Sequence, residues 1–150
     1  MEWKGVMPAI TTCFDEHLNI DHEFTARHVN WLVENGCTGI VTNGSLGEGG
    51  TLSMDEKIAL WKTVAGAVGD RVPIVAAIAS MTTAEACAQA AEAASAGCSG
   101  LMVLPPYVYR GDWQEMKYHV SEIVKATPLS CMLYNNPVAY GTDFLPEQIA

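Results

Sequence analysis

The stretch VPIVAAIASMTTAEACAQAAEAASAGCSGLMVLPP, residues 72–106, contains one complete strand–helix–strand unit. Its first apolar run, residues 72–77, is typical of a buried strand, and the second, residues 100–104, ends at a double proline. Between them Thr82 and Glu85 form a T-x-x-E capping box that begins an alanine-rich helix. Because a helix connects two buried strands, we predict that the strands are parallel.

The same alternation continues on both sides of this unit. Further strands are predicted at residues 6–12, 38–42 and 129–134. Further helices are predicted to begin at Asp21, at Ser53 with Glu56 in a second capping box, and at Asp112. Leu145 is expected to lead into a fifth helix. The tetrapeptide GCTG at 36–39 recurs as GCSG at 97–100, each time between a helix end and a strand, which supports a repeating βα unit.

Two architectures fit five such units: a doubly wound open sheet and the first part of a (β/α)8 barrel. Loops with hydroxyls, glycines or aromatics follow four of the strands, which favours a barrel with its site at the C-terminal ends of the strands. We therefore predict an α/β fold, a TIM barrel of which this chain covers about the first five strands and four helices. A closed barrel takes about 250 residues. Residues 1–150 are thus expected to be the N-terminal part of a single barrel domain.

Composition and charge exclude several classes of partner. Of the 150 residues, 49 % are hydrophobic and 17 % are charged, which predicts a globular fold rather than disorder. A formal net charge of −9 argues against nucleic acid or an anionic membrane surface as partner. No apolar run reaches the roughly 20 residues of a membrane span, and the first residues do not resemble a signal peptide. A cytoplasmic protein is expected.

Cysteines and histidines show no metal-binding pattern. The five cysteines are odd in number and form no CxxC pair, so we expect reduced thiols that pack as small apolar side chains: Cys13, Cys37, Cys87, Cys98 and Cys131. The four histidines lie away from the predicted strand ends: His17, His22, His28 and His119. Neither a metal site nor a cofactor is predicted.

The glycine-rich loop NGSLGEGG, residues 43–50, follows the second predicted strand. Its glycines allow backbone N–H groups to turn toward an anion, either a carboxylate or a phosphate. The loop matches neither GxGxxG nor the Walker pattern, and a purely structural turn is the alternative. Glu48 could act as a general base, but we favour a structural role in which it holds the loop.

Tyrosines follow the fourth and fifth predicted strands. Tyr134 ends the fifth, and because a tyrosine hydroxyl has a pKa of about 10, it relays protons only with assistance. Ser45 is a candidate partner; the alternative is that Tyr134 caps the core with its hydroxyl in water. Tyr107 and Tyr109 either line a pocket or pack under their loop. No lysine falls at a predicted strand end, so the chain lacks a candidate for an imine-forming lysine.

Three segments together resemble one known family: GIVTNGSLGEGGTLSMDEK at 39–57, PPY at 105–107 and YNNP at 134–137. They are similar to the dihydrodipicolinate synthase and N-acetylneuraminate lyase family, and the resemblance covers nearly the whole chain. Members are (β/α)8 barrels, commonly tetramers, that condense a lysine amine with pyruvate or another 2-keto acid. The resemblance implies a class I Schiff-base lyase that assembles as a homo-oligomer, a dimer or tetramer.

The resemblance also implies residue roles. The catalytic residues would be Tyr134 and Ser45 of a proton relay, with Tyr107 reaching into the neighbouring subunit's site. The substrate-binding residues would be those of the loop, with N–H groups of Leu46 and Gly47 holding the keto-acid carboxylate: Gly44, Ser45, Leu46 and Gly47. The nucleophilic lysine is expected beyond residue 150, at the end of the sixth strand.

Two positions depart from the family pattern. Leu46 stands where a threonine is usual, which removes one side-chain hydrogen bond and makes the pocket more apolar. Ala139 stands where dihydrodipicolinate synthases carry the arginine that binds their second substrate. The departures favour an aldolase or dehydratase acting on a sugar-derived or aromatic 2-keto acid. The alternatives are a dihydrodipicolinate synthase proper, a non-catalytic keto-acid-binding half-barrel if the natural chain ends at residue 150, and an open-sheet module that binds phosphate.

Overall fold

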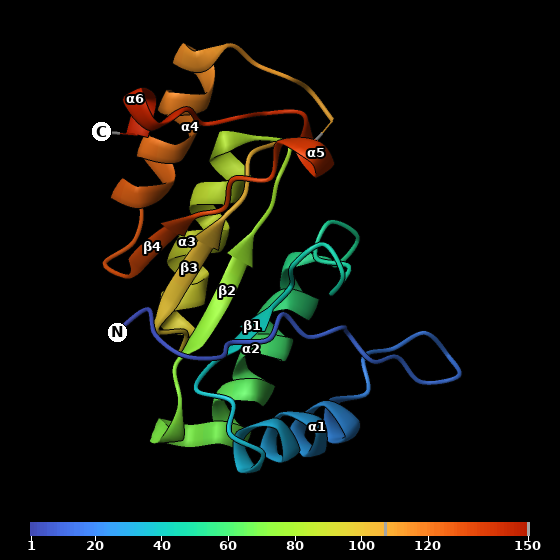
Figure 1. Ribbon diagram of the computed structural model, residues 1–150. Coiled ribbons are helices and arrows are strands. Elements are labelled where there is room, and N and C mark those ends of the chain that lie inside the picture. Colours follow the sequence, from blue (N-terminus) through green and yellow to red (C-terminus); the bar gives the residue numbers. More distant parts are fainter. Residues whose placement is uncertain (107, 150) are drawn as a thin grey trace.

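A single parallel sheet with helices between its strands organises the computed structural model, which describes residues 1–106 and 108–149 (Figure 1). The strands lie in chain order: β1 (Ile40–Thr42), β2 (Ile74–Ile78), β3 (Gly100–Val103) and β4 (Ser130–Leu133). The long helices are α1 (His22–Glu34), α2 (Met54–Val68) with the short 3-10 turn η1 (Gly69–Arg71), α3 (Thr83–Ser95) and α4 (Trp113–Lys125). One-turn helices α5 (Pro137–Tyr140) and α6 (Pro146–Ile149) follow β4. The predicted βα alternation is confirmed.

The predicted helix starts are also confirmed, because Asp21, Ser53, Thr82 and Asp112 are the N-cap residues of the four long helices. One prediction was wrong in its detail. Thr82 accepts from the backbone of Glu85, but the Glu85 carboxylate accepts from the hydroxyl of Ser80 at 2.6 Å instead of from the N-cap backbone. Ser80 therefore donates to the carboxylate that would accept from the N-cap backbone in a complete capping box.

The first predicted strand, residues 6–12, is not a regular strand. Its ladder with β1 is a single bridge between Ala9 and Val41, in which Ile10 donates to Val41 and Val41 donates to Pro8, each at 2.9 Å. Pro8 has no N–H to donate, and β1 has only three residues, so a longer ladder cannot form. The described chain therefore has four strands and a bridged extended segment, where five strands were predicted.

The two faces of the sheet bury different clusters. Alternating residues of β2 divide between them, with Ile74, Ala76 and Ile78 facing the helices and Val75 and Ala77 facing the opposite side. The helix face forms the larger core. The opposite face carries a smaller cluster to which two tyrosines, Tyr134 and Tyr140, add their rings.

Parallel pairing brings the C-terminal ends of all four strands to one edge of the sheet. In Figure 1 this edge is at the top, where α5 lies over the strand ends and the loop after β1 comes up beside it. The loop 43–53 and the segment 134–140 therefore meet, although about 90 positions separate them in the chain. No helix in the described part of the chain is long and apolar enough to cross a membrane.

The loop after β1 depends on one close backbone contact, which predicts a sensitive substitution. A Cβ atom on Gly49 would lie 1.8 Å from the carbonyl oxygen of Asn43, whose own φ is 60°. We expect Gly49→Ala to lower the free energy of unfolding by about 3 kcal/mol or more, because two backbone segments must move apart. Urea unfolding measures the change. Gly66→Ala, on α2 with nothing within 4 Å of its Cβ, is the control and should stabilise by up to about 1 kcal/mol.

A buried histidine predicts how stability changes with pH. His119 on α4 is 3 % exposed and its Nδ1 lies 3.0 Å from the hydroxyl of Thr83, and burial lowers its pKa below the usual 6.5. As pH falls below 6.5, the unfolded chain takes up a proton that the folded chain does not, so stability is lost. The melting temperature should fall more steeply between pH 7 and 5 than in His119→Gln. His17→Gln, on an exposed side chain, should melt with the wild-type pH dependence.

Candidate active site

The loop after β1 is held by its own backbone. The N–H of Gly49 donates to the carbonyl of Gly44 at 3.1 Å, and that of Glu48 donates to Ser45 at 3.2 Å. Glu48 adopts a φ of 55°, a left-handed conformation that closes the turn. We predicted that Glu48 holds the loop. Its backbone does so, whereas its carboxylate accepts no hydrogen bond from the described residues.

Several N–H groups of this loop have no acceptor among the described residues, and those of Leu46 and Gly47 are adjacent members of this set. The loop is nevertheless anchored, because the carbonyl of Gly47 accepts from the hydroxyl of Thr12 at 2.6 Å. Gly47 is also close-packed, since a Cβ there would lie 2.8 Å from the carbonyl oxygen of Ile10. Two fixed donors adjacent in sequence are suited to a carboxylate.

The side chain of Leu46 is 75 % exposed and does not line the cavity described below. That Leu46 makes the keto-acid pocket more apolar stays a prediction.

Tyr134 continues directly from β4, with its N–H donating to the carbonyl of Val103 at 2.8 Å. Its half-buried ring packs on the smaller cluster, and its hydroxyl accepts from the side-chain amide of Asn136 at 3.2 Å. The predicted position of Tyr134, at the C-terminal edge of the sheet, is therefore confirmed. Its hydroxyl is hydrogen-bonded, not simply solvated.

Ser45 is bonded to a residue that the sequence analysis did not select. Its hydroxyl shares a hydrogen bond with that of Tyr140, and the ring of Tyr140 meets the ring of Tyr134 edge-on, with centroids 6.0 Å apart and an angle of 73°. Ser45 and Tyr134, which we had paired directly, are thus brought together through Tyr140.

Helix α5 positions Tyr140 through end signals at both of its termini. The side chain of Asn136 caps it by accepting from Ala139 at 3.2 Å, Pro137 occupies its first turn, and Gly141 ends it with a φ of 67°. Asn, Pro and Gly at these spacings are a recognised helix pattern. These three residues therefore predict the helix, although we had predicted only the end of a strand in this segment.

Asn135 ties this segment to the chain that follows it. Its side-chain amide donates to Asp143 at 2.9 Å and to the carbonyl of Phe144 at 3.2 Å, and its side-chain oxygen accepts from the N–H of Phe144 at 3.1 Å. Three hydrogen bonds from one side chain close the loop around α5. The segment that contains Tyr140 is therefore anchored at both of its ends.

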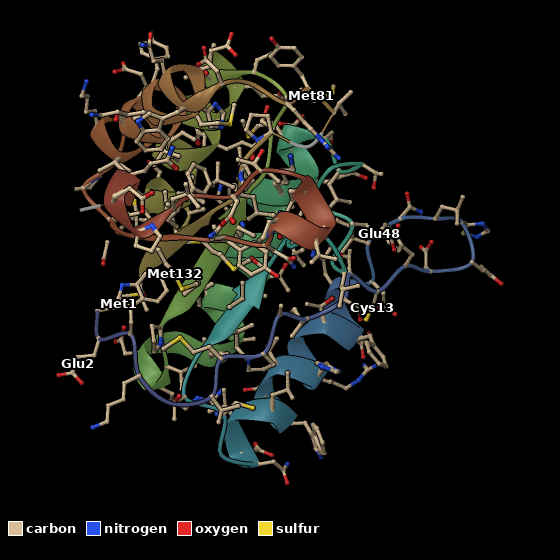
Figure 2. All side chains as sticks on the ribbon, turned by 45° about the horizontal axis from the view of Figure 1, so that its top comes forward. Met1, Glu2, Cys13, Glu48, Met81 and Met132 are labelled. Atoms are coloured by element: carbon tan, nitrogen blue, oxygen red, sulfur yellow. The ribbon has the colours of Figure 1, made fainter. Side chains whose placement is uncertain are left out.

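A cavity of about 270 Å³ lies between the loop and α5 and is lined by Gly44, Ser45, Glu48, Gly50, Thr51, Ala79 and Tyr140. Figure 2 shows Glu48 in the loop beside the ribbon of α5. Glu48 is the one charged side chain in the lining, and the other lining groups offer hydroxyls and backbone. The cavity therefore suits an uncharged, hydroxyl-bearing group.

Other candidates lie elsewhere. Tyr107 falls outside the described residues, and Tyr109 lines a separate cavity of about 430 Å³ near His119. Lys57 on α2 is 4 % exposed and burial lowers its pKa, partly offset by Glu85, but it does not line the cavity beside Ser45. All five cysteines are free thiols, and burial raises the pKa of Cys98 to about 12. Residues 1–106 and 108–149 contain no cluster of three or more metal-ligating side chains.

Comparisons with known proteins agree with this fold. The chain is 37 % identical, over all its 150 residues, to the 4-hydroxy-tetrahydrodipicolinate synthase of Heliobacterium modesticaldum, and covers 50 % of it. Among solved structures, the dihydrodipicolinate synthase of Bacillus anthracis is 33 % identical with a TM-score of 0.95, over 99 % of this chain and 51 % of that one. YagE of E. coli K12, solved in complex with pyruvate, is 26 % identical with a TM-score of 0.93, over 98 % and 49 %.

The chain thus spans about half the length of the relatives it matches. Its sheet and helices are part of a (β/α)8 barrel, as predicted. The family model described as the Dihydrodipicolinate synthetase family matches residues 2–150, and the chain belongs to this family.

Proposed function

We propose that this chain carries the keto-acid half of a class I, Schiff-base lyase that cleaves, condenses or dehydrates a 2-keto or 2-keto-3-deoxy acid. Residues 1–150 would form the N-terminal part of one barrel domain. The nucleophilic lysine would come from sequence beyond residue 150, at the end of the sixth strand, because the cavity lining contains no lysine.

One observation carries the proposal: the N–H groups of Leu46 and Gly47 have no acceptor among the described residues, and they directly follow Ser45, whose hydroxyl is bonded to that of Tyr140. Fixed backbone donors can neutralise a carboxylate without a cationic side chain, and none of the described residues that line the cavity is a lysine or an arginine. Pyruvate, present in the YagE structure, offers the required carboxylate next to a carbonyl carbon.

The hydroxyls would then serve proton transfer. A lysine imine draws electrons from the neighbouring bonds of the keto acid, and a positioned hydroxyl moves the protons that the reaction gains or releases. We assign this role to Tyr134 and Ser45. Tyr107 would contribute from a neighbouring subunit of a dimer or tetramer, and this assignment stays a prediction.

Ala139 favours an aldolase or dehydratase over a dihydrodipicolinate synthase. It is exposed on α5 next to Tyr140, and a methyl group there cannot bind the carboxylate of a second acidic substrate. The second candidate is dihydrodipicolinate synthase itself, which the names of the curated relatives favour. A neutral hydroxyaldehyde and an acidic aldehyde of equal length, each supplied with pyruvate, would separate the two.

Borohydride reduction with pyruvate tests the lysine chemistry in the full-length protein that contains this chain. We expect an irreversible adduct on one lysine, located by peptide mapping beyond residue 150, and loss of activity in proportion to labelling. Lys57→Met should label as the wild type does, because Lys57 lies away from the cavity. An adduct on any lysine within residues 1–150, or no adduct at all, would contradict the proposal.

A further inference from the structure

Tyr140 occupies a position that the proposed chemistry does not yet use. Its hydroxyl is bonded to that of Ser45, its ring contacts that of Tyr134, and it lines the cavity between them. These three contacts place it between two residues to which we have assigned proton transfer. We propose that Tyr140 is a positioning residue that fixes the Ser45 hydroxyl and the Tyr134 ring for that transfer. The proposal rests on the proposed function for its chemistry.

Ser45 needs such a partner because nothing else described fixes its hydroxyl. It lies on an exposed turn, and a serine side chain on a turn has three accessible rotamers. Among the described residues, Tyr140 is the one with which the Ser45 Oγ shares a hydrogen bond. That bond selects one rotamer, and it points the Ser45 oxygen toward the cavity that Tyr140 also lines.

Tyr140 can supply this constraint because its own position is fixed. Asn136 and Gly141 define the two ends of α5, with the N–H of Gly141 donating to the carbonyl of Pro137 at 2.8 Å. The guanidinium of Arg110 packs against Gly141, where an added Cβ would lie 2.4 Å from Cζ. A four-residue helix closed at both ends and covered at one of them leaves the Tyr140 ring little freedom.

The ring contact serves Tyr134 in the same way. Edge-on aromatic pairs are favoured over random orientations, and both rings pack on the smaller cluster, on the face of the sheet opposite the helices. Asn136 holds the Tyr134 hydroxyl at 3.2 Å, so ring and hydroxyl of Tyr134 are each restrained from α5. Helix α5 therefore orients both proton-transfer residues. Ser45 is oriented through Tyr140, and Tyr134 is oriented through Tyr140 and Asn136.

The step that depends on this arrangement is loss of a proton from carbon 3 of bound pyruvate. The C–H electron pair becomes the C=C bond of the enamine, the nitrogen of the protonated imine takes back the C=N π pair, and the proton leaves through the hydroxyls to water. Borohydride trapping carried to its end point measures whether the imine forms and does not depend on the rate of proton transfer at carbon 3. Proton exchange at carbon 3 and imine trapping should therefore respond differently to loss of the Tyr140 hydroxyl.

The test compares wild type, Tyr140→Phe and Val138→Ala in the full-length protein. Val138 is on the same helix and 97 % exposed, so Val138→Ala controls for changes to α5. Exchange of the carbon 3 protons of pyruvate with deuterated water is followed by NMR, and imine formation by borohydride trapping. We expect Tyr140→Phe to slow exchange about tenfold with trapping unchanged, and Val138→Ala to leave both unchanged. Equal exchange rates in all three proteins would overturn the proposal.

A double-mutant cycle tests the contact without using the reaction. Melting temperatures are measured for Ser45→Ala, Tyr140→Phe and the double variant. If the two hydroxyls are partners, the double variant melts close to the lower of the single variants; fully additive shifts would overturn the proposal. If wild-type protein traps no pyruvate, the proposed function fails, and the cycle still decides whether Tyr140 holds Ser45.

Discussion

The in-register parallel pairing of β1 to β4 is the constraint on which the site depends. All four parallel strands begin at one edge of the sheet, so the loops that follow them all leave from the opposite edge. The pairing of Val103 with Leu133 places Tyr134 immediately past the end of β3, and the pairing of Thr42 with Ala76 places the start of the glycine loop beside the last two residues of β2. A shift of one residue in either register would turn Tyr134 or the loop to the helix face.

The groups that form the candidate site are mostly uncharged. Its donors are backbone N–H groups, its acceptors are hydroxyls, and the carboxylate of Glu48 supplies the one formal charge in the cavity lining. Backbone donors keep their position without side-chain entropy, which is why a short glycine-rich turn can hold an anion where a flexible cation would have to be ordered first. The close contact of Gly49 with Asn43 provides that rigidity.

Local signals predicted the helices well, because N-cap residues such as Ser53 and Asp112 act within one turn and need no distant partner. Sequence reasoning failed where a partner outside the local pattern decides the outcome. The Glu85 carboxylate accepts from the hydroxyl of Ser80, which precedes the helix, and residues 6–12 form only one bridge with the short strand β1.

In the candidate site too, local signals were predicted and a distant partner was missed. Tyr134 was found because it ends a strand, and the loop because its glycines are conspicuous, but the partner of Ser45 lies about 90 positions away. No periodicity links the two. Only the folded edge of the sheet, with α5 lying over it, shows that Tyr140 and not Tyr134 contacts the Ser45 hydroxyl.

Helix α5 has an evolutionary consequence. Two of its positions, Val138 and Ala139, are exposed on a turn whose ends are fixed by Asn136 and Gly141, and neither takes part in the sheet. These two positions can therefore diverge while Tyr140 and the barrel scaffold stay the same. In the proposed lyase, a lineage that exchanges this dipeptide would change which electrophile meets the keto acid, and selection for new substrates would leave its trace in this one turn before it reached the core.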